Sequence, residues 1–173
     1  MLTLVVGGSA SGKSSFAESL MVSGDSERRI YLATMLLRDE ECEKRALHHR
    51  EMRRDKAFET LECPRALERA NIPPRSSVLL EDLSNLAANE FFGDEDSAGA
   101  AGRIMSGILR LEQLSEALVI VSNELFLDGM EYDRETLDYL MCLSALNRAV
   151  AARADLVYEV ICGIPILWKE SAS

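Results

Sequence analysis

Hydrophobic residues along this chain fall into short runs that alternate with longer stretches in which they recur every three or four positions. Short runs are typical of buried strands, and the longer stretches are typical of helices with one apolar face. Their alternation predicts an α/β fold with a mostly parallel sheet and helices on both faces. The expected strands are Leu2–Val6, Ile30–Ala33, Val78–Leu80, Leu118–Ser122, Leu156–Val160 and Ile164–Trp168.

The last expected strand differs from the others. Ile164–Trp168 contains Pro165 and closely follows the break at Cys162-Gly163. Because proline cannot donate to a neighbouring strand, it is confined mainly to the edges of sheets. We therefore expect an antiparallel edge hairpin with Leu156–Val160 at the C-terminus.

The expected helices complete a single domain over residues 1–173, since no linker composition divides the chain. The segment Phe92–Gly102 is acidic and Gly-rich, and it is predicted to be a disordered or mobile loop. The helices are expected at Lys13–Val22, Asp39–Arg54, Pro64–Ala70, Leu83–Phe91, Ala101–Glu116 and Asp133–Ala152.

An octapeptide directly after the first apolar run carries the most specific chemistry. Gly7-Gly8-Ser9-Ala10-Ser11-Gly12-Lys13-Ser14 matches the pattern G-x-x-x-x-G-K-[ST]. Its glycines let the backbone fold around a polyphosphate with several N–H groups pointing inward. Lys13 can reach the β and γ phosphates, and Ser14 can hold Mg²⁺. The strand-loop-helix context favours a bound nucleoside triphosphate, and a three-layer fold like that of P-loop NTPases, over a simple Gly-rich turn.

Composition narrows the partners and the compartment. The chain has 19 basic and 29 acidic residues, and the net charge of −10 opposes binding to nucleic acid or anionic membranes. No apolar stretch is long enough to span a bilayer, and the start lacks the basic region of a secretion signal. The four cysteines show no C-x-x-C spacing, which fits reduced thiols. We expect a cytoplasmic protein without nucleic-acid binding or membrane insertion.

A second group of candidate residues follows the strand that ends at Thr34. His48 and His49 are the only histidines, and they lie in a strongly charged segment. Two interpretations stay open: a solvated helix face, or a second anion site where a neutral imidazole attacks phosphorus and forms a phosphoramidate. The basic residues of this segment that would neutralise phosphate are Lys44, Arg45, Arg50, Arg53 and Arg54.

The apolar run Val78–Leu80 is followed at once by two carboxylates. Strands that end in an acidic residue position Mg²⁺ in many phosphate-loop enzymes, so Glu81 or Asp82 is a candidate metal ligand. Acidic residues at such a place also cap helices, and the residues alone do not decide between these roles. Asn123 and Glu124 end another expected strand at the same sheet edge and are candidates for lining the site.

Taken together, these segments resemble the bifunctional adenosylcobinamide kinase / adenosylcobinamide-phosphate guanylyltransferase family of cobalamin assembly. The likeness covers nearly the whole chain, in order and in spacing. It rests on the octapeptide and on Tyr31-Leu32-Ala33-Thr34, His48-His49, Thr60-Leu61-Glu62, Leu79-Leu80-Glu81, Val121-Ser122-Asn123-Glu124, Asn147, Ala154-Asp155-Leu156-Val157-Tyr158 and Gly163-Ile164-Pro165.

The resemblance implies two reactions. A nucleoside triphosphate, ATP or GTP, phosphorylates the aminopropanol hydroxyl of adenosylcobinamide, and GMP then passes from GTP through a histidine to that phosphate, with release of pyrophosphate. Members of this family form trimers, so a homotrimer is expected. With His49 as nucleophile and Lys13 at the phosphates, the implied nucleotide-binding residues are Gly7, Gly8, Ser9, Ala10, Ser11, Gly12, Lys13, Ser14, Ala33, Thr34, Met35, Arg50, Glu51, Met52, Arg53, Glu62 and Glu81.

The chain departs from the family pattern at four places. Ala10 stands where an arginine is usual, Phe58 stands where a tryptophan is usual, and Leu125–Asp128 replaces a Gly-rich stretch. The fourth is a residue inserted between His49 and Thr60. The first change removes a positive charge from the phosphate loop, and the third puts bulkier residues near the corrinoid site. Two alternatives therefore stay open beside the bifunctional enzyme: a small-metabolite kinase that lacks guanylyl transfer, and a nucleotide-binding regulatory module without catalysis.

Overall fold

The computed structural model describes residues 1–24, 26–36, 56–93, 96–125 and 131–171. Seven strands form one sheet in the order β3-β2-β4-β5-β1-β6-β7, and each neighbouring pair is parallel except β6 with β7. The strands are β1 (Leu2–Gly7), β2 (Arg28–Ala33), β3 (Phe58–Glu62), β4 (Ser76–Glu81), β5 (Ala117–Asn123), β6 (Leu156–Ile161) and β7 (Ile164–Glu170).

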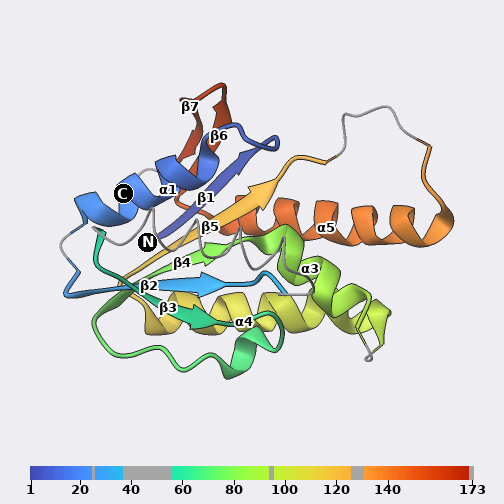
Figure 1. The fold of residues 1–173 in the computed structure, drawn as a ribbon, viewed down its shortest axis with the longest axis horizontal. Helices are drawn as coiled ribbons and strands as arrows, with labels where there is room; N and C mark the ends of the chain where they lie inside the picture. Colours follow the sequence, from blue (N-terminus) through green and yellow to red (C-terminus); the bar gives the residue numbers. More distant parts are fainter. Residues whose placement is uncertain (25, 37–55, 94–95, 126–130, 172–173) are drawn as a thin grey trace.

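Helices cover both faces of the sheet and make three layers (Figure 1). Helix α1 packs on one face, over β1, β4, β5 and β6, while α3, α4 and α5 pack together on the other. The described helices are α1 (Lys13–Ser23), α3 (Leu83–Phe91), α4 (Ala100–Leu114) and α5 (Arg134–Arg153), with the 3-10 turns η2 (Leu67–Arg69) and η3 (Ser97–Gly99).

Alternate residues of the central strands supply two separate cores. Leu4 and Leu80 belong to the larger core beneath α3, α4 and α5, whereas Val5 and Leu79 join Ala17 of α1 on the other face. These residues are 0–1% exposed, so the strands are buried on both faces. That is why they occur in the sequence as continuous apolar runs.

The predicted α/β fold is confirmed, including the antiparallel pair at the C-terminal edge. Each of the six expected strands is present, with boundaries that extend the prediction by up to two residues at either end. The hairpin turn has Cys162 at φ 51° and Gly163 at φ 81°. Positive φ at both residues defines the tight turn that suits two twisted antiparallel strands.

Two sequence-based expectations need correction. No strand was expected at β3, which is mostly exposed and whose short apolar pattern is interrupted by Glu59. The helix predicted at Pro64–Ala70 is wrong: only the short turn η2 forms, because Ala66 takes a left-handed φ of 53°.

Two other expectations concern segments that the structure does not describe. The helix predicted at Asp39–Arg54 lies outside the described residues. The same holds for most of Leu125–Asp128, of which only Leu125 is described.

The loop predicted at Phe92–Gly102 is shorter than expected. Ser97–Gly99 forms the turn η3, and α4 already begins at Ala100. Asp96 caps η3 by accepting a hydrogen bond from the Ala98 N–H at 3.1 Å. The predicted loop extended too far because glycines were taken as a sign of a loop, whereas Gly102 lies inside α4 with open space beside it.

Candidate functional site

The phosphate loop joins β1 to α1, and the side chain of Lys13 at its end folds back onto the main chain at its start. Lys13 is 7% exposed, and its ammonium donates to the Gly8 carbonyl oxygen at 3.1 Å. Ala10 and Gly12 both have positive φ, at 55° and 92°. This backbone turns the loop back over the start of α1, where main-chain N–H groups and the helix dipole favour an anion.

The turn between β6 and β7 lies against the phosphate loop. The Gly163 N–H donates to the Ser11 carbonyl oxygen at 2.8 Å. A Cβ on Gly12 would lie 3.3 Å from the Gly163 Cα, and a Cβ on Gly7 would lie 2.7 Å from the Val160 carbonyl oxygen. Close backbone packing therefore requires glycine at position 7, and at position 12 the positive φ favours glycine.

Glu81, at the end of β4, reaches the phosphate loop from a strand that is far away in sequence. The Ser14 hydroxyl donates to Glu81 Oε1 at 2.6 Å. The other oxygen, Oε2, is buried and has no hydrogen-bond partner among the described residues. Burial raises the pKa of Glu81 to about 7, against the opposing effect of the Ser14 hydrogen bond. An acidic group with an unsatisfied buried oxygen thus lies next to the expected triphosphate site.

Asp82, the next residue, has a different role. Its carboxylate caps α3 by accepting from the Asn85 N–H at 2.7 Å, and it also accepts from the Ser84 hydroxyl at 2.6 Å and from Asn123 Nδ2 at 3.0 Å. These bonds engage both carboxylate oxygens. Of the two roles that the sequence left open for this acidic pair, the structure shows helix capping for Asp82, and it places the Glu81 carboxyl group beside Ser14.

The expected nucleotide residues on the neighbouring strands lie at the same edge. Ala33 is in register with Glu62 of β3 on one side and with Glu81 of β4 on the other. Gly7 is in register with Asn123 of β5. The carboxyl ends of the parallel strands thus bring the loop and these residues to one edge of the sheet, where ligands bind in open α/β folds.

Part of the predicted site lies outside the described residues. The segment 37–55 contains the predicted nucleophile and the basic cluster. Their roles stay predictions. The site residues concerned are His49, Arg50, Glu51, Met52 and Arg53.

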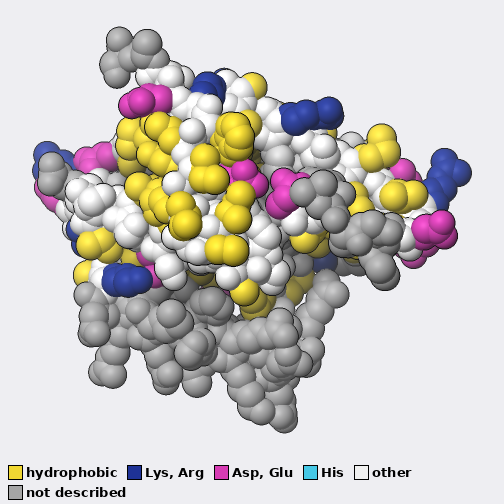
Figure 2. All heavy atoms as spheres, turned by 90° about the horizontal axis from the view of Figure 1, so that it is seen from above, with side chains coloured by type: hydrophobic (Ala, Val, Ile, Leu, Met, Phe, Trp, Pro, Cys, Tyr) yellow, Lys and Arg dark blue, Asp and Glu magenta, His cyan; other side chains and the backbone are white. Residues whose placement is uncertain are grey.

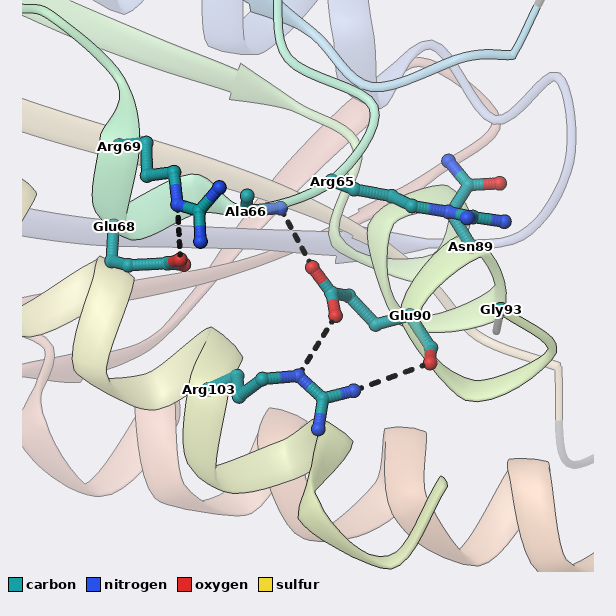
Figure 3. Close-up of a pocket in the computed structure, with 8 residues that line it drawn as sticks. All are labelled: Arg65, Ala66, Glu68, Arg69, Asn89, Glu90, Gly93 and Arg103. Atoms are coloured by element: carbon teal, nitrogen blue, oxygen red, sulfur yellow. Dashed lines mark hydrogen bonds and ion pairs between the residues drawn. The ribbon is translucent and has the colours of Figure 1, made fainter. Parts of the chain in front are cut away.

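Two cavities lie beside the turn η2, and both are lined by Arg65, Ala66 and Arg69. The larger, of about 330 Å³, is lined by Leu61, Glu62 and Pro64 among others. The smaller, of about 170 Å³, is shown in Figure 3, where the Glu90 carboxylate lies between the Ala66 N–H at 2.7 Å and Arg103 Nε at 3.1 Å. Glu90 thereby ties α3 to η2 and α4. Sequence reasoning missed this network because its members lie far apart along the chain.

Sequence reasoning also missed a set of buried polar groups behind the acidic pair. Asn89 donates from Nδ2 to the carbonyl oxygens of Thr34 and Pro64, at 2.8 and 2.9 Å. The Tyr139 hydroxyl donates to the Ser84 carbonyl oxygen at 3.1 Å, and burial raises the pKa of Tyr139 to about 12. Polar residues on apolar helix faces are the one sequence feature that indicates such a network.

The fold and the loop define a nucleotide-binding protein of the P-loop class. Solved structures with this fold include the flagellar accessory protein FlaH from Methanocaldococcus jannaschii, with a TM-score of 0.53 and 12% identity over 98% of this chain and 78% of that one. The RadB recombinase has a TM-score of 0.50 and 14% identity over 91% of this chain and 73% of that one. At such identities the likeness concerns the fold alone.

Within this class, the chain belongs to the cobinamide kinase / cobinamide phosphate guanyltransferase family, whose model matches residues 3–167. The resemblance noted from the motifs is therefore confirmed. Relatives include the bifunctional adenosylcobalamin biosynthesis protein CobU of Escherichia coli (strain K12), 31% identical over 98% of this chain and 100% of the relative. The bifunctional adenosylcobalamin biosynthesis protein CobP of Pseudomonas aeruginosa is 30% identical over 98% of each chain.

Two further observations concern the predictions about membrane insertion and about the cysteines. None of the helices in the described ranges combines the length and apolarity that crossing a bilayer requires. Cys63, Cys142 and Cys162, the described cysteines, are free thiols.

Proposed function

We propose that this chain phosphorylates the hydroxyl of adenosylcobinamide with a nucleoside triphosphate and then transfers GMP from GTP to the new phosphate. Membership of the family over residues 3–167 supports both steps. The observation that carries the first step is the phosphate loop, in which the Lys13 ammonium lies over the loop at the Gly8 carbonyl oxygen and the Ser14 hydroxyl contacts the carboxyl group of Glu81. The products are adenosylcobinamide-GDP and pyrophosphate.

In the kinase step the acceptor hydroxyl oxygen forms a bond to the γ-phosphorus, and the bond from that phosphorus to the bridging oxygen breaks. The nucleoside diphosphate leaves, and the hydroxyl proton goes to solvent. Main-chain N–H groups of the loop, the ammonium of Lys13 and the start of α1 stabilise negative charge that shifts toward the leaving oxygen. Lys13 has to exchange the Gly8 carbonyl for phosphate oxygens, which a flexible ammonium stem permits.

The donor set at Ser14 and Glu81 fits Mg²⁺, a hard cation that takes oxygen ligands and keeps several waters. The buried, unpartnered Oε2 of Glu81 is the observation that supports this fit. Ser14 and Glu81 would supply protein oxygens, and nucleotide oxygens and water would complete the shell. Bound there, Mg²⁺ would neutralise phosphate charge. Asp82 would continue to cap α3 and would thereby hold the main chain next to Glu81.

In the transfer step we propose that His49 attacks the α-phosphorus of GTP as a neutral imidazole, which releases pyrophosphate and leaves GMP on nitrogen. The phosphate of the acceptor then displaces the imidazole. Family membership is the support for His49 and for nucleotide contacts by the segment Arg50–Arg53. The cavity of about 330 Å³ beside Glu62 supports a purine site, since a carboxylate accepts hydrogen bonds from the N–H groups of guanine.

Labelling with GTP tests the transfer step directly. The protein is incubated with GTP labelled at the α-phosphorus, and we expect acid-labile, base-stable label on the wild type and on His48→Ala but none on His49→Ala. Label from the γ-phosphorus would not remain on the protein. Kinase activity that depends on Lys13 and survives in His49→Ala, without α-label on the wild type, would favour the small-metabolite kinase. Nucleotide binding without either activity would favour the regulatory module.

We further propose a homotrimer, and the apolar edge hairpin supports self-association. Ile164 and Trp168 of β7 are 65% and 67% exposed. Figure 2 views the molecule from the side of this hairpin and shows hydrophobic side chains gathered over it. Light scattering should give a mass three times the 19.2 kDa of the chain. A monomeric mass at micromolar concentration would rule the trimer out. A cytoplasmic location stays a prediction.

A further inference from the structure

Thr34 comes directly after β2, and its polar atoms all have partners inside the protein. The residue is 0% exposed. The Thr34 hydroxyl donates to the Asp82 carbonyl oxygen at 2.8 Å, and the Asp82 N–H donates to the same hydroxyl at 2.7 Å. The Thr34 N–H donates to the Glu81 carbonyl oxygen at 3.1 Å. One residue thus holds the main chain on both sides of the Glu81-Asp82 peptide.

Two asparagines hold the same turn from other elements. Asn89 of α3 donates from Nδ2 to the Thr34 carbonyl oxygen at 2.8 Å, which fixes Thr34 itself. Asn123 of β5 donates from Nδ2 to the Asp82 carboxylate at 3.0 Å. The residues that follow β4 are therefore held by β2, α3 and β5 together. Because these bonds fix the main chain next to Glu81, they also fix the point from which the Glu81 side chain extends.

We propose that Thr34 is a positioning residue that aims the Glu81 carboxyl group at Ser14 through the main chain of Asp82, and that its hydroxyl does not contact the nucleotide. This inference rests on the proposed function, because it assigns Thr34 to the Mg²⁺-nucleotide site. The sequence led us to expect nucleotide contacts from Ala33–Met35, and this proposal excludes the Thr34 hydroxyl from those contacts. The hydroxyl cannot turn to a phosphate without leaving two buried main-chain groups of Asp82 unpaired.

Two substitutions of Thr34 distinguish the role of its hydroxyl from the role of its side-chain volume. Thr34→Val keeps the volume and removes both hydrogen bonds to Asp82, whereas Thr34→Ser keeps the hydroxyl. The freed turn would shift Glu81 relative to Ser14, and a shift on the order of 1 Å is enough to weaken a positioned charge contact. Thr3→Val is the matched control, because Thr3 is 2% exposed on β1 and removing its hydroxyl leaves the Glu81 turn untouched.

The test measures GTP binding to the full chain by calorimetry, once with excess MgCl₂ and once with EDTA. For the wild type we expect Mg²⁺ to raise the affinity. For Thr34→Val we expect this gain to fall by about tenfold, since two hydrogen bonds are lost, with the affinity in EDTA unchanged. Thr34→Ser should restore the gain, and Thr3→Val should keep it.

Several outcomes would overturn the inference. A Thr34→Val protein with the full Mg²⁺ gain would show that the hydroxyl does not position Glu81. A loss of affinity that is equal in EDTA and in MgCl₂ would indicate direct contact with the nucleotide instead. If Thr34→Val does not fold, Thr34→Ala replaces it, because it also removes both hydrogen bonds to Asp82, with the same expected loss. Absence of GTP binding by the wild type would contradict the proposed function itself and is thereby distinguished from these results.

Discussion

Replacing the carboxyl group of Glu81 by an amide should stabilise the nucleotide-free protein and weaken its response to Mg²⁺. In the wild type Glu81 Oε2 is buried without a partner among the described residues, and burial raises the pKa of Glu81 to about 7. Glu81→Gln keeps the shape and an oxygen that can accept from the Ser14 hydroxyl. It removes the charge that has to be buried when the carboxyl group ionises.

The free energy of unfolding depends on pH because Glu81 binds a proton more tightly in the folded state than in the unfolded state. The pKa of Glu81 rises from 4.5 to about 7 on folding, so the folded state binds more protons than the unfolded state between these values. Stability therefore falls as the pH rises through this window, and the loss is complete above about pH 7. At about 1.36 kcal/mol per unit, the shift corresponds to about 3 kcal/mol in the free energy of unfolding.

Urea unfolding of the wild type and Glu81→Gln at pH 5 and at pH 8 measures this difference. We expect the gain in stability of Glu81→Gln to be larger at pH 8 than at pH 5, by up to about 3 kcal/mol. Glu116→Gln is the matched control: Glu116 is exposed, so the substitution should change the free energy of unfolding by no more than about 0.5 kcal/mol. A gain for Glu81→Gln that does not grow with pH would refute the account of a buried, unsatisfied carboxyl group.

Three further substitutions test other parts of the structure. Lys13→Ala should slow phosphoryl transfer on the order of a hundredfold or more, because it removes charge that stabilises the transition state; single-turnover kinetics with labelled nucleotide measure this. Glu90→Ala should lower the free energy of unfolding by about 1–3 kcal/mol, because it removes the carboxylate that accepts from the Ala66 N–H and from Arg103 Nε, whereas Glu68→Ala, in an exposed pair, should lower it by less than about 1 kcal/mol. Gly107→Val should destabilise by about 1–3 kcal/mol through overpacking against η2, and equal stability to wild type in denaturant would contradict this.

The parts of the fold that depend on local patterns were accessible from the sequence. The phosphate loop is defined by eight consecutive residues, and the central strands are apolar because both faces of the sheet are covered. Strand β3 was missed, since it lies at an edge of the sheet and needs β2 beside it to form. The turn at Ala66 was missed as well, because its N–H is satisfied by Glu90, 24 residues away.

The sequence indicated candidate residues for the site but not how these residues contact one another. The sequence offered Glu81 and Asp82 as equal candidates for a metal ligand. Their difference depends on Ser14, which is 67 residues from Glu81, and on Asn123, which is 41 residues from Asp82. Such pairings follow from the strand order, and no spacing along the chain reveals them. The same holds for Thr34, whose partner Asp82 is 48 residues away.

One measurement tests the central claim, that a single chain carries out both phosphoryl and guanylyl transfer. The purified protein is mixed with adenosylcobinamide, GTP and MgCl₂, and the corrinoid products are followed by mass spectrometry over time. We expect adenosylcobinamide phosphate first and adenosylcobinamide-GDP second, with pyrophosphate released in step with the second product. Accumulation of the phosphate without any adenosylcobinamide-GDP, or no change in the corrinoid at all, would contradict this claim.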